Sequence, residues 1–226
     1  MTVSHQGSRL TAPRRARSPE AKQRRRSAIL DEALRQLEKT GFDRIAMSDI
    51  ARATGVAKGT LYLYFQTKEE LFLALLQRLL DDWLDQLDSA LAAGAHRLPA
   101  AALTALFAES LTARPALRRL LALQGPVLEQ NVEYERALRL KWRLAGRLTA
   151  TGSQLERRTV FLRPGDGTRL LLAIQALTVG LQVQAEPAPV VRRILEAPGL
   201  EALRLEFDRE FRVAAGALLT GLERTN

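Results

Sequence analysis

The sequence of 226 residues contains no cysteine, two histidines and few aromatic side chains, namely seven phenylalanines, three tyrosines and two tryptophans. Without cysteine the chain cannot form a disulfide, a thiolate zinc site or a cysteine nucleophile. His5 and His96 fall in a polar N-terminal stretch and in a predicted loop, so the chain lacks the parts of a histidine-based triad or metal cluster. We therefore expect a protein that is not an enzyme, with no catalytic residues, no metal site and no cofactor.

The sequence also lacks a long apolar segment. Its longest apolar run, residues 170–183, is interrupted by Gln175, Thr178 and Gln182 and is too short to span a bilayer. Residues 1–28 are polar and basic, unlike the apolar core of a secretory signal. We therefore expect a soluble, cytoplasmic protein with no part in the membrane.

Leucine and alanine are abundant. Apolar residues make up 46% of the chain, and these two strong helix formers dominate them. No stretch alternates apolar and polar residues as a half-buried strand would, and no internal repeat is visible. The sequence therefore predicts an all-α fold, with helices near residues 19–40, 49–54, 58–65, 68–93, 98–112, 115–124, 127–150, 165–183 and 200–222, and one helical turn near 190–196 in a proline-rich connector.

Hydroxyl side chains precede three of the predicted helices. Ser18 stands before Pro19, Ser48 before the second helix, and Thr67 before two glutamates. A hydroxyl in that position accepts a hydrogen bond from the first amides of a helix. We therefore expect Ser18, Ser48 and Thr67 to cap these helices.

The fourth predicted helix has an acidic side. Asp81, Asp82, Asp85 and Asp88 lie opposite an apolar stripe that runs from Phe72 to Leu91. A charged run on an amphipathic helix usually faces water. We therefore expect these aspartates on a solvated face, without a role in chemistry.

Positive charge is concentrated in the first third of the chain. Residues 1–68 hold 14 Lys and Arg against 6 Asp and Glu, whereas the remaining residues hold 20 against 19. Residues 1–17 are rich in Arg, Ser, Thr and Pro, so we expect a disordered basic arm there. A basic segment beside a neutral body indicates a polyanion-binding module on a carrier domain. A basic tail that only aids solubility is the alternative.

Residues 48–65 have the proportions of a helix-turn-helix: a helix of about two turns, a tight turn at Gly55 and a second short helix. Glycine permits the positive φ that such a turn requires. The stretch from Lys58 to Tyr64 turns a cation, hydroxyl groups and the bare backbone of Gly59 away from the inward side. Such groups hold phosphates and reach base edges in a major groove. The inward positions carry Ile50, Ala51, Val56, Leu61 and Phe65.

The run IARATGVAKGTLYLYFQTKEEL, residues 50–71, resembles the DNA-binding signature of the TetR (tetracycline-repressor-like) family of bacterial transcriptional regulators. The close resemblance covers about residues 20–72. It implies an N-terminal three-helix helix-turn-helix DNA-binding domain, residues 18–68. A larger helical bundle for ligand binding and dimerisation, residues 69–226, is expected to follow.

The resemblance also implies roles for single residues. Lys58, Gly59 and Leu63 would meet base edges. Phosphates would be held by Ser48, Thr60, Tyr62, Tyr64 and Lys68. Ala57 departs from the family pattern, which commonly has Ser or Thr there, so contacts assigned to that hydroxyl are in doubt.

The second domain is expected to form the dimer and to hold a small molecule. Predicted helices 165–183 and 200–222 are the candidate interface, with an apolar stripe from Leu203 to Leu218, and a purely intrachain core is the alternative. The resemblance implies a hydrophobic or cationic small-molecule inducer. The candidate ligand-binding residues are Phe107, Tyr134, Trp142, Gln175 and Thr178.

Together these features predict a ligand-responsive transcriptional repressor. As the family does, it would bind a palindromic double-stranded DNA operator as a homodimer and be released by the inducer. The basic residues from Arg14 to Arg26 would either enter a minor groove or attract DNA non-specifically. A nucleoid-like, non-specific DNA binder and a helical adaptor protein are the alternatives.

Overall fold

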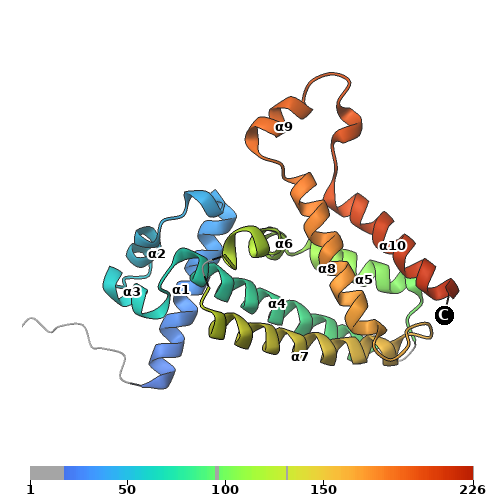
Figure 1. Cartoon of the computed structure of the whole chain (residues 1–226), viewed down its shortest axis with the longest axis horizontal. Coiled ribbons are helices and arrows are strands. Elements are labelled where there is room, and N and C mark those ends of the chain that lie inside the picture. The colour runs from blue at the N-terminus through green and yellow to red at the C-terminus, as the bar shows by residue number, and fades with distance from the viewer. Residues whose placement is uncertain (1–17, 95–96, 131, 226) are drawn as a thin grey trace, which may run out of the picture.

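The computed structural model of the chain describes residues 18–94, 97–130 and 132–225. These residues form ten α-helices and no β-strand (Figure 1). The all-α fold expected from the leucine- and alanine-rich composition is therefore confirmed. The predicted basic arm, residues 1–17, and both histidines lie outside the described residues.

The N-terminal head consists of one long helix and three short elements. They are α1 (Pro19–Thr40), η1 (Phe42–Arg44), α2 (Met47–Ala53) and α3 (Lys58–Tyr64). Ser18 caps α1 as expected, because its hydroxyl accepts a hydrogen bond from the Ala21 amide at 3.2 Å. The core of the head is formed by the fully buried side chains of Ile29, Ala33, Leu37, Ile50, Leu61 and Phe65.

The head is joined to the body through the long helix α4 (Lys68–Ala93). Thr67 caps it as expected, and the seven consecutive residues from Glu70 to Leu76 are all buried. Seven residues make about two turns, so every side of the helix is covered there. Phe42 of the head packs on Phe72, and Arg136 of the body pairs with Glu70. Because α1, α6 (Pro115–Leu123) and α7 (Tyr134–Arg158) all pack on α4, the head and the body share the start of this helix (Figure 1).

Helix α7 (Tyr134–Arg158) runs beside α4 in the same direction (Figure 1). Arg143 pairs with Asp81, and Arg147 reaches Asp85 at 2.6 Å. Asp88 also lies 3.6 Å from Arg147. The expectation of a solvated acidic face was therefore wrong for Asp81 and Asp88, which the arginines of α7 partly cover, whereas Asp82 and Asp85 are exposed as expected.

The remaining helices complete the body. They are α5 (Ala100–Thr112), α6 (Pro115–Leu123), α8 (Asp166–Ala185) and α10 (Phe207–Thr225), with α10 packed against α5 and α8. At the crossing of α7 and α8, a Cβ added to Gly167 would lie 2.1 Å from the Gly152 carbonyl oxygen. Only glycine allows the two backbones to approach so closely.

The bounds of two predicted helices in the body were wrong. The expected helix 127–150 is replaced by the π-helical turn η2 (Gln124–Leu128) and by α7, which starts later and continues to Arg158. Pro126 has no amide to donate, and a wider turn tolerates that loss. The last helix begins at Phe207 rather than near residue 200, so Leu203 is exposed and does not join its apolar stripe.

Residues 186–206 form a projection that stands clear of the body (Figure 1). It contains α9 (Pro189–Leu195), close to the predicted helical turn, and the 3-10 turn η3 (Glu201–Leu203). We call this projection the α9 arm.

Truncation of the two leucines of α3 should change the stability of the protein by very different amounts. Leu61→Ala should lower the free energy of unfolding by about 2–5 kcal/mol, because Leu61 is fully buried. Leu63→Ala should change it by about 0.5 kcal/mol or less, because Leu63 is 85% exposed. Urea unfolding followed by circular dichroism measures both, and equal losses would contradict this placement of α3.

Candidate functional site

The turn between α2 and α3 is fixed by backbone geometry. Gly55 has φ of +64°, the left-handed conformation that the sequence led us to expect. The amide of Val56 donates to the Ala51 carbonyl at 3.0 Å, and the Thr54 hydroxyl donates to the Ile50 carbonyl at 2.8 Å. These bonds set the angle at which α3 leaves α2.

The structure corrects the predicted start of α2. The helix begins at Met47 after Ala46, and no side chain caps it, so Ser48 lies exposed in its first turn. Burial of Ile45 and Met47 directs the chain into the helix two residues before a Ser48 cap would. Ser48 keeps its place near the beginning of the helix, where helix amides and a hydroxyl both suit a phosphate.

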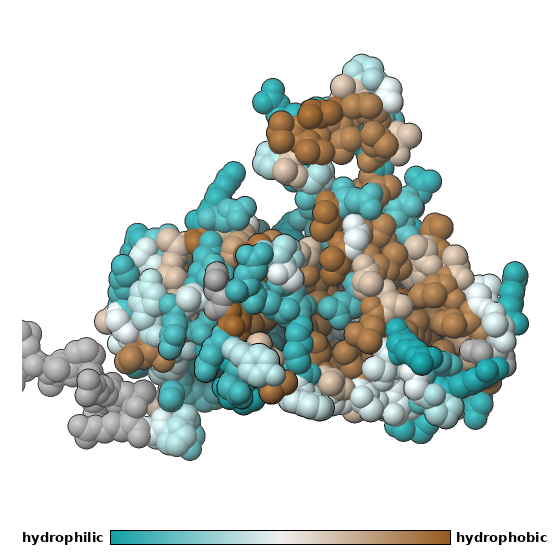
Figure 2. Space-filling model, viewed as in Figure 1, coloured by the Kyte–Doolittle hydropathy of each residue, from teal (hydrophilic) through white to brown (hydrophobic). Residues whose placement is uncertain are grey.

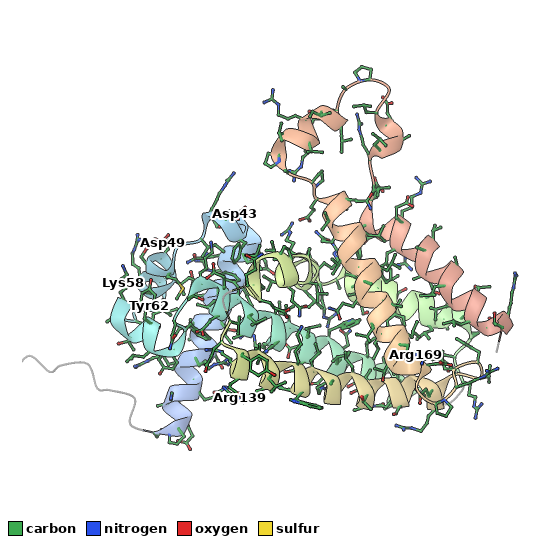
Figure 3. All side chains as sticks on the ribbon, in the orientation of Figure 1. Asp43, Asp49, Lys58, Tyr62, Arg139 and Arg169 are labelled. Atoms are coloured by element: carbon green, nitrogen blue, oxygen red, sulfur yellow. The ribbon has the colours of Figure 1, made fainter. Side chains whose placement is uncertain are left out.

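Helix α3 presents an outer face that the core does not use. Leu61 and Phe65 are buried beneath it, whereas Leu63 is 85% exposed and Tyr62 is 39% exposed. Figure 3 shows Lys58 and Tyr62 on the outer side of the head, away from the body. A Cβ added to Gly59 would meet no described atom within 4 Å, so the helix backbone is open to close approach there.

Thr60, Tyr64 and Lys68 lie at the edges of this face, partly buried. The Tyr64 side chain packs against the head core. The ammonium group of Lys68 lies 4.1 Å from the centre of the Phe42 ring, a cation–π contact. Burial lowers the pKa of Lys68, and Asp43 and Glu69 oppose that shift. Lys68 therefore lies against the head rather than extending into solvent.

Of the basic residues that precede the helix-turn-helix, those from Lys22 to Arg26 belong to α1. The Arg26 guanidinium lies 5.3 Å from the centre of the Phe65 ring. Burial, and then the charges of nearby arginines, lower the pKa of Arg26. Arg26 thus packs against the head core and is not part of a mobile arm.

A buried glutamate links the end of α3 to the body. Glu70 accepts a hydrogen bond from the Gln66 amide at 2.8 Å and one from Arg136 of α7 at 2.7 Å. Its own amide donates to the Thr67 hydroxyl at 3.1 Å. The short joint between α3 and α4 is therefore held by a side chain that α7 also holds, and the sequence alone gave no signal for this pair.

A cavity of about 170 Å³ lies between α4, η2 and α7. Its apolar wall consists of Leu73, Leu76, Leu80, Val132, Ala137, Leu140 and Leu144. Both acids at its edge are paired: Asp81 with Arg143, and Glu129 with Lys141 at 2.7 Å. The cavity is thus apolar, with compensated charges at its edge.

The five predicted ligand-binding residues do not line this cavity. Phe107 and Thr178 are fully buried, and the Thr178 hydroxyl donates to the Ile174 carbonyl at 2.7 Å. Gln175 is partly buried and contacts Gln124 at 3.5 Å. Tyr134 and Trp142 are 73% and 71% exposed, because α7 turns Ala137, Leu140 and Leu144 toward α4 and both rings lie off that face.

Family comparisons cover almost the whole described chain. The family described as bacterial regulatory proteins, tetR family, matches residues 29–75. The tetracyclin repressor-like C-terminal domain matches residues 77–226. The first match includes α2, α3 and the turn between them. The second match includes the residues that line the cavity, except for those at the start of α4.

A curated relative matches the N-terminal part. The HTH-type transcriptional regulator RutR of Escherichia coli K12 is 39% identical over 79 residues, which are 35% of this chain and 36% of the relative. The match therefore spans about a third of the relative's length.

Solved structures share the whole fold. A TetR/AcrR-family transcriptional regulator from Thermobifida fusca has a TM-score of 0.54 at 21% identity, covering 90% of this chain and 99% of that one. FadR from Bacillus subtilis in complex with stearoyl-CoA has a TM-score of 0.50 at 18% identity, covering 86% and 98%. At these identities the likeness concerns the fold.

The uncapped start of α3 predicts a stabilising substitution. Ala57 is the N-cap residue of α3 and offers no side-chain hydrogen bond. Ala57→Ser should raise the free energy of unfolding by about 1 kcal/mol, because a serine hydroxyl accepts from the first amides of the helix. Ala53→Ser, at the exposed end of α2, is the matched control and should give no gain. Thermal unfolding of the two variants measures the difference, and equal midpoints would argue against an uncapped start.

Proposed function

The chain belongs to the tetR family of bacterial regulatory proteins, and on that premise we propose that it is a ligand-responsive repressor. Residues 18–68 bind a palindromic DNA operator, and residues 69–226 form the homodimer and hold the small-molecule inducer. The protein acts in the cytoplasm and catalyses no reaction. In the described residues no helix combines the length and apolar character needed to cross a membrane.

The exposed face of α3 is the observation that carries the DNA-binding part of the proposal. Leu63 and Tyr62 are exposed on a helix that buries Leu61 on its inner side, and the exposed Lys58 is its first residue. Apolar contact with a thymine methyl suits Leu63, and a cation near base edges suits Lys58. Thr60, Tyr62, Tyr64 and Ser48 supply hydroxyl groups at the rim of this face, where phosphates lie. Lys68 would have to leave Phe42 to reach a phosphate.

The short length of α3 supports a dimer and a palindrome. Its seven residues can reach only a few base pairs, which gives little specificity in a genome. A homodimer related by a two-fold axis doubles the contacts and reads two inverted half-sites. Helices α8 and α10 carry the exposed apolar residues Leu172, Val183 and Val213, which suit that interface.

The cavity between α4 and α7 is the best-supported inducer site, in place of the five residues expected from the sequence. Its wall is apolar, and the aspartate and glutamate at its edge are already paired with arginine and lysine. A cation would find no uncompensated partner among these groups, so a neutral apolar ligand fits better than a cationic one. The same fold holds an acyl ligand in FadR, which was solved with stearoyl-CoA.

Ligand binding reaches the head through the start of α4. Leu73 lines the cavity one turn beyond Glu70, which holds the Gln66 amide and Arg136. A ligand that alters the spacing of α4 and α7 therefore acts on the joint behind α3. A coupling of about 1–3 kcal/mol is the usual size for such effects and changes DNA affinity by about 5–150-fold.

The proposed face of α3 predicts two kinds of loss. Lys58→Ala should change the sequence preference of the protein, because Lys58 is placed at base edges. Tyr64→Phe should lower affinity for all sequences by a similar factor, because only a phosphate contact is lost. Lys39, which lines the groove on the body side of the head, gives the control variant Lys39→Ala.

Selection from a random duplex pool, followed by sequencing, measures these preferences. An unchanged preference profile for Lys58→Ala would show that the recognition face is assigned wrongly. Coating of any duplex by the unmodified chain would favour the non-specific alternative, and failure to bind duplex at low salt would favour the adaptor.

The cavity predicts a preference for uncharged ligands. Toluene should bind at least tenfold more tightly than benzylamine, its cationic near-isostere, because transfer of an uncompensated charge into an apolar site is costly. An apolar cavity of about 150 Å³ is known to hold benzene, so the size is suitable. Ala137→Trp should abolish binding by filling the cavity, whereas Ala145→Trp, exposed on the same helix, should not. Titration calorimetry measures the binding of both ligands to the unmodified chain and of toluene to the two variants. Tighter binding of benzylamine than of toluene would contradict an apolar ligand site in this cavity.

A further inference from the structure

Four arginines gather where α1 meets the body. Arg26 belongs to α1, Arg78 to α4, and Arg136 and Arg143 to α7. Burial is the main cause that lowers the pKa of Arg26, and the charges of the other three arginines lower it further. Figure 2 shows hydrophilic surface on the lower left of the molecule, where α1 passes the start of α7. Positive charge from three helices is therefore concentrated in one place.

The nearby carboxylates neutralise only three of these four arginines. The paired arginines are Arg78, with Asp31 at 2.7 Å, Arg136, with Glu70 at 2.7 Å, and Arg143, with Asp81. Arg26 instead lies over the ring of Phe65 and forms no ion pair with any described residue. Its half-buried guanidinium is thus left with like charges around it and no carboxylate of its own.

Arg139 adds a second arginine without a partner. It is exposed and lies one helical turn from both Arg136 and Arg143 on α7. Glu135, one turn before it, is also exposed and forms no ion pair within the described chain. Figure 3 shows Arg139 at the outer edge of the molecule, near the start of α7.

We call the five arginines at residues 26, 78, 136, 139 and 143 the α1–α7 patch. Five arginines and three paired carboxylates leave an excess of two positive charges. Partly buried charges are screened by salt less than exposed ones, so the field of this patch persists at physiological ionic strength.

We propose that the α1–α7 patch binds a phosphate group, which Arg26 and Arg139 receive. A guanidinium presents a planar fork of donors that matches the oxygens of a phosphate. The excess of two charges matches the charge of about −1.5 to −2 that a phosphate monoester carries at neutral pH. The DNA backbone and a free phosphorylated molecule both offer such a group, and the experiments below separate these two sources.

A phosphate in this position would connect the head to the body. Arg26 belongs to the head and Arg139 to the body, and Glu70 with Arg136 already links the two nearby. All the residues that the resemblance assigns to DNA lie at or before Lys68, so Arg139 of the body is a contact that the proposed function does not contain.

Titration of the full-length chain with pyrophosphate tests the site in the absence of DNA. Arg139→Glu should raise the dissociation constant of pyrophosphate at least tenfold, because it replaces an attraction by a repulsion. Arg157→Glu is the matched control, since Arg157 is an exposed arginine of the same helix, about 27 Å further along, and forms no ion pair in the described chain. It should leave the constant within about twofold. Calorimetry measures all three proteins, and absence of binding, or an equal loss in both variants, would overturn the proposal.

The salt dependence of DNA binding identifies the source of the phosphate, and this arm rests on the proposed function. If the DNA backbone supplies it, Arg139→Ala should reduce the slope of log affinity against log salt by about 0.9 per protomer, whereas Arg157→Ala should leave the slope unchanged. An unchanged slope for Arg139→Ala, with binding of pyrophosphate retained by the unmodified chain, assigns the site to a free phosphorylated molecule. Failure of the unmodified chain to bind duplex would contradict the proposed function, and the pyrophosphate titration would still decide the site.

Discussion

The first two turns of α4 are buried, and this burial fixes the head on the body. Residues 70–76 are covered on every side, by the head on one face and by the body on the others. A junction of this kind cannot hinge freely, since any rotation would expose leucines to water. The orientation of α3 is therefore set by how the body packs, and not by a flexible linker.

Glu70 makes that dependence specific. Its carboxylate accepts from the amide of Gln66, directly after α3, and from Arg136 of α7. A buried carboxylate that lost its arginine would be left uncompensated, which is strongly unfavourable. The proposed ligand cavity, whose wall includes Leu73, lies one helical turn from this pair.

The helix-turn-helix could be predicted from the sequence because its determinants are local. Positive φ at Gly55 and the buried pair Leu61 and Phe65 follow from residue type and helical spacing. The cap at Thr67 follows in the same way. Ser48 was misjudged as a cap because burial of Ile45 and Met47, a tertiary effect, decides where α2 begins.

The exposed and buried faces of the body helices were harder to predict, because they too depend on tertiary packing. Tyr134 and Trp142 have the size and spacing of core residues, but α7 turns its arginines toward the aspartates of α4 and leaves both rings exposed. The face of α7 that meets α4 carries Leu140, Leu144 and Leu148, with the paired arginines beside them. The cavity, which lies between the same helices, could not be located until that packing of distant segments was known.

In the proposed function, the exposed face of α3 reads sequence as part of a symmetric dimer. The most direct measurement is fluorescence anisotropy at fixed physiological salt, comparing the palindrome selected from a random pool with a scrambled duplex of the same composition. We expect a preference for the palindrome of about 1,000-fold or more, the usual range for specific recognition, with two protomers per duplex. Equal affinity for both duplexes would contradict it.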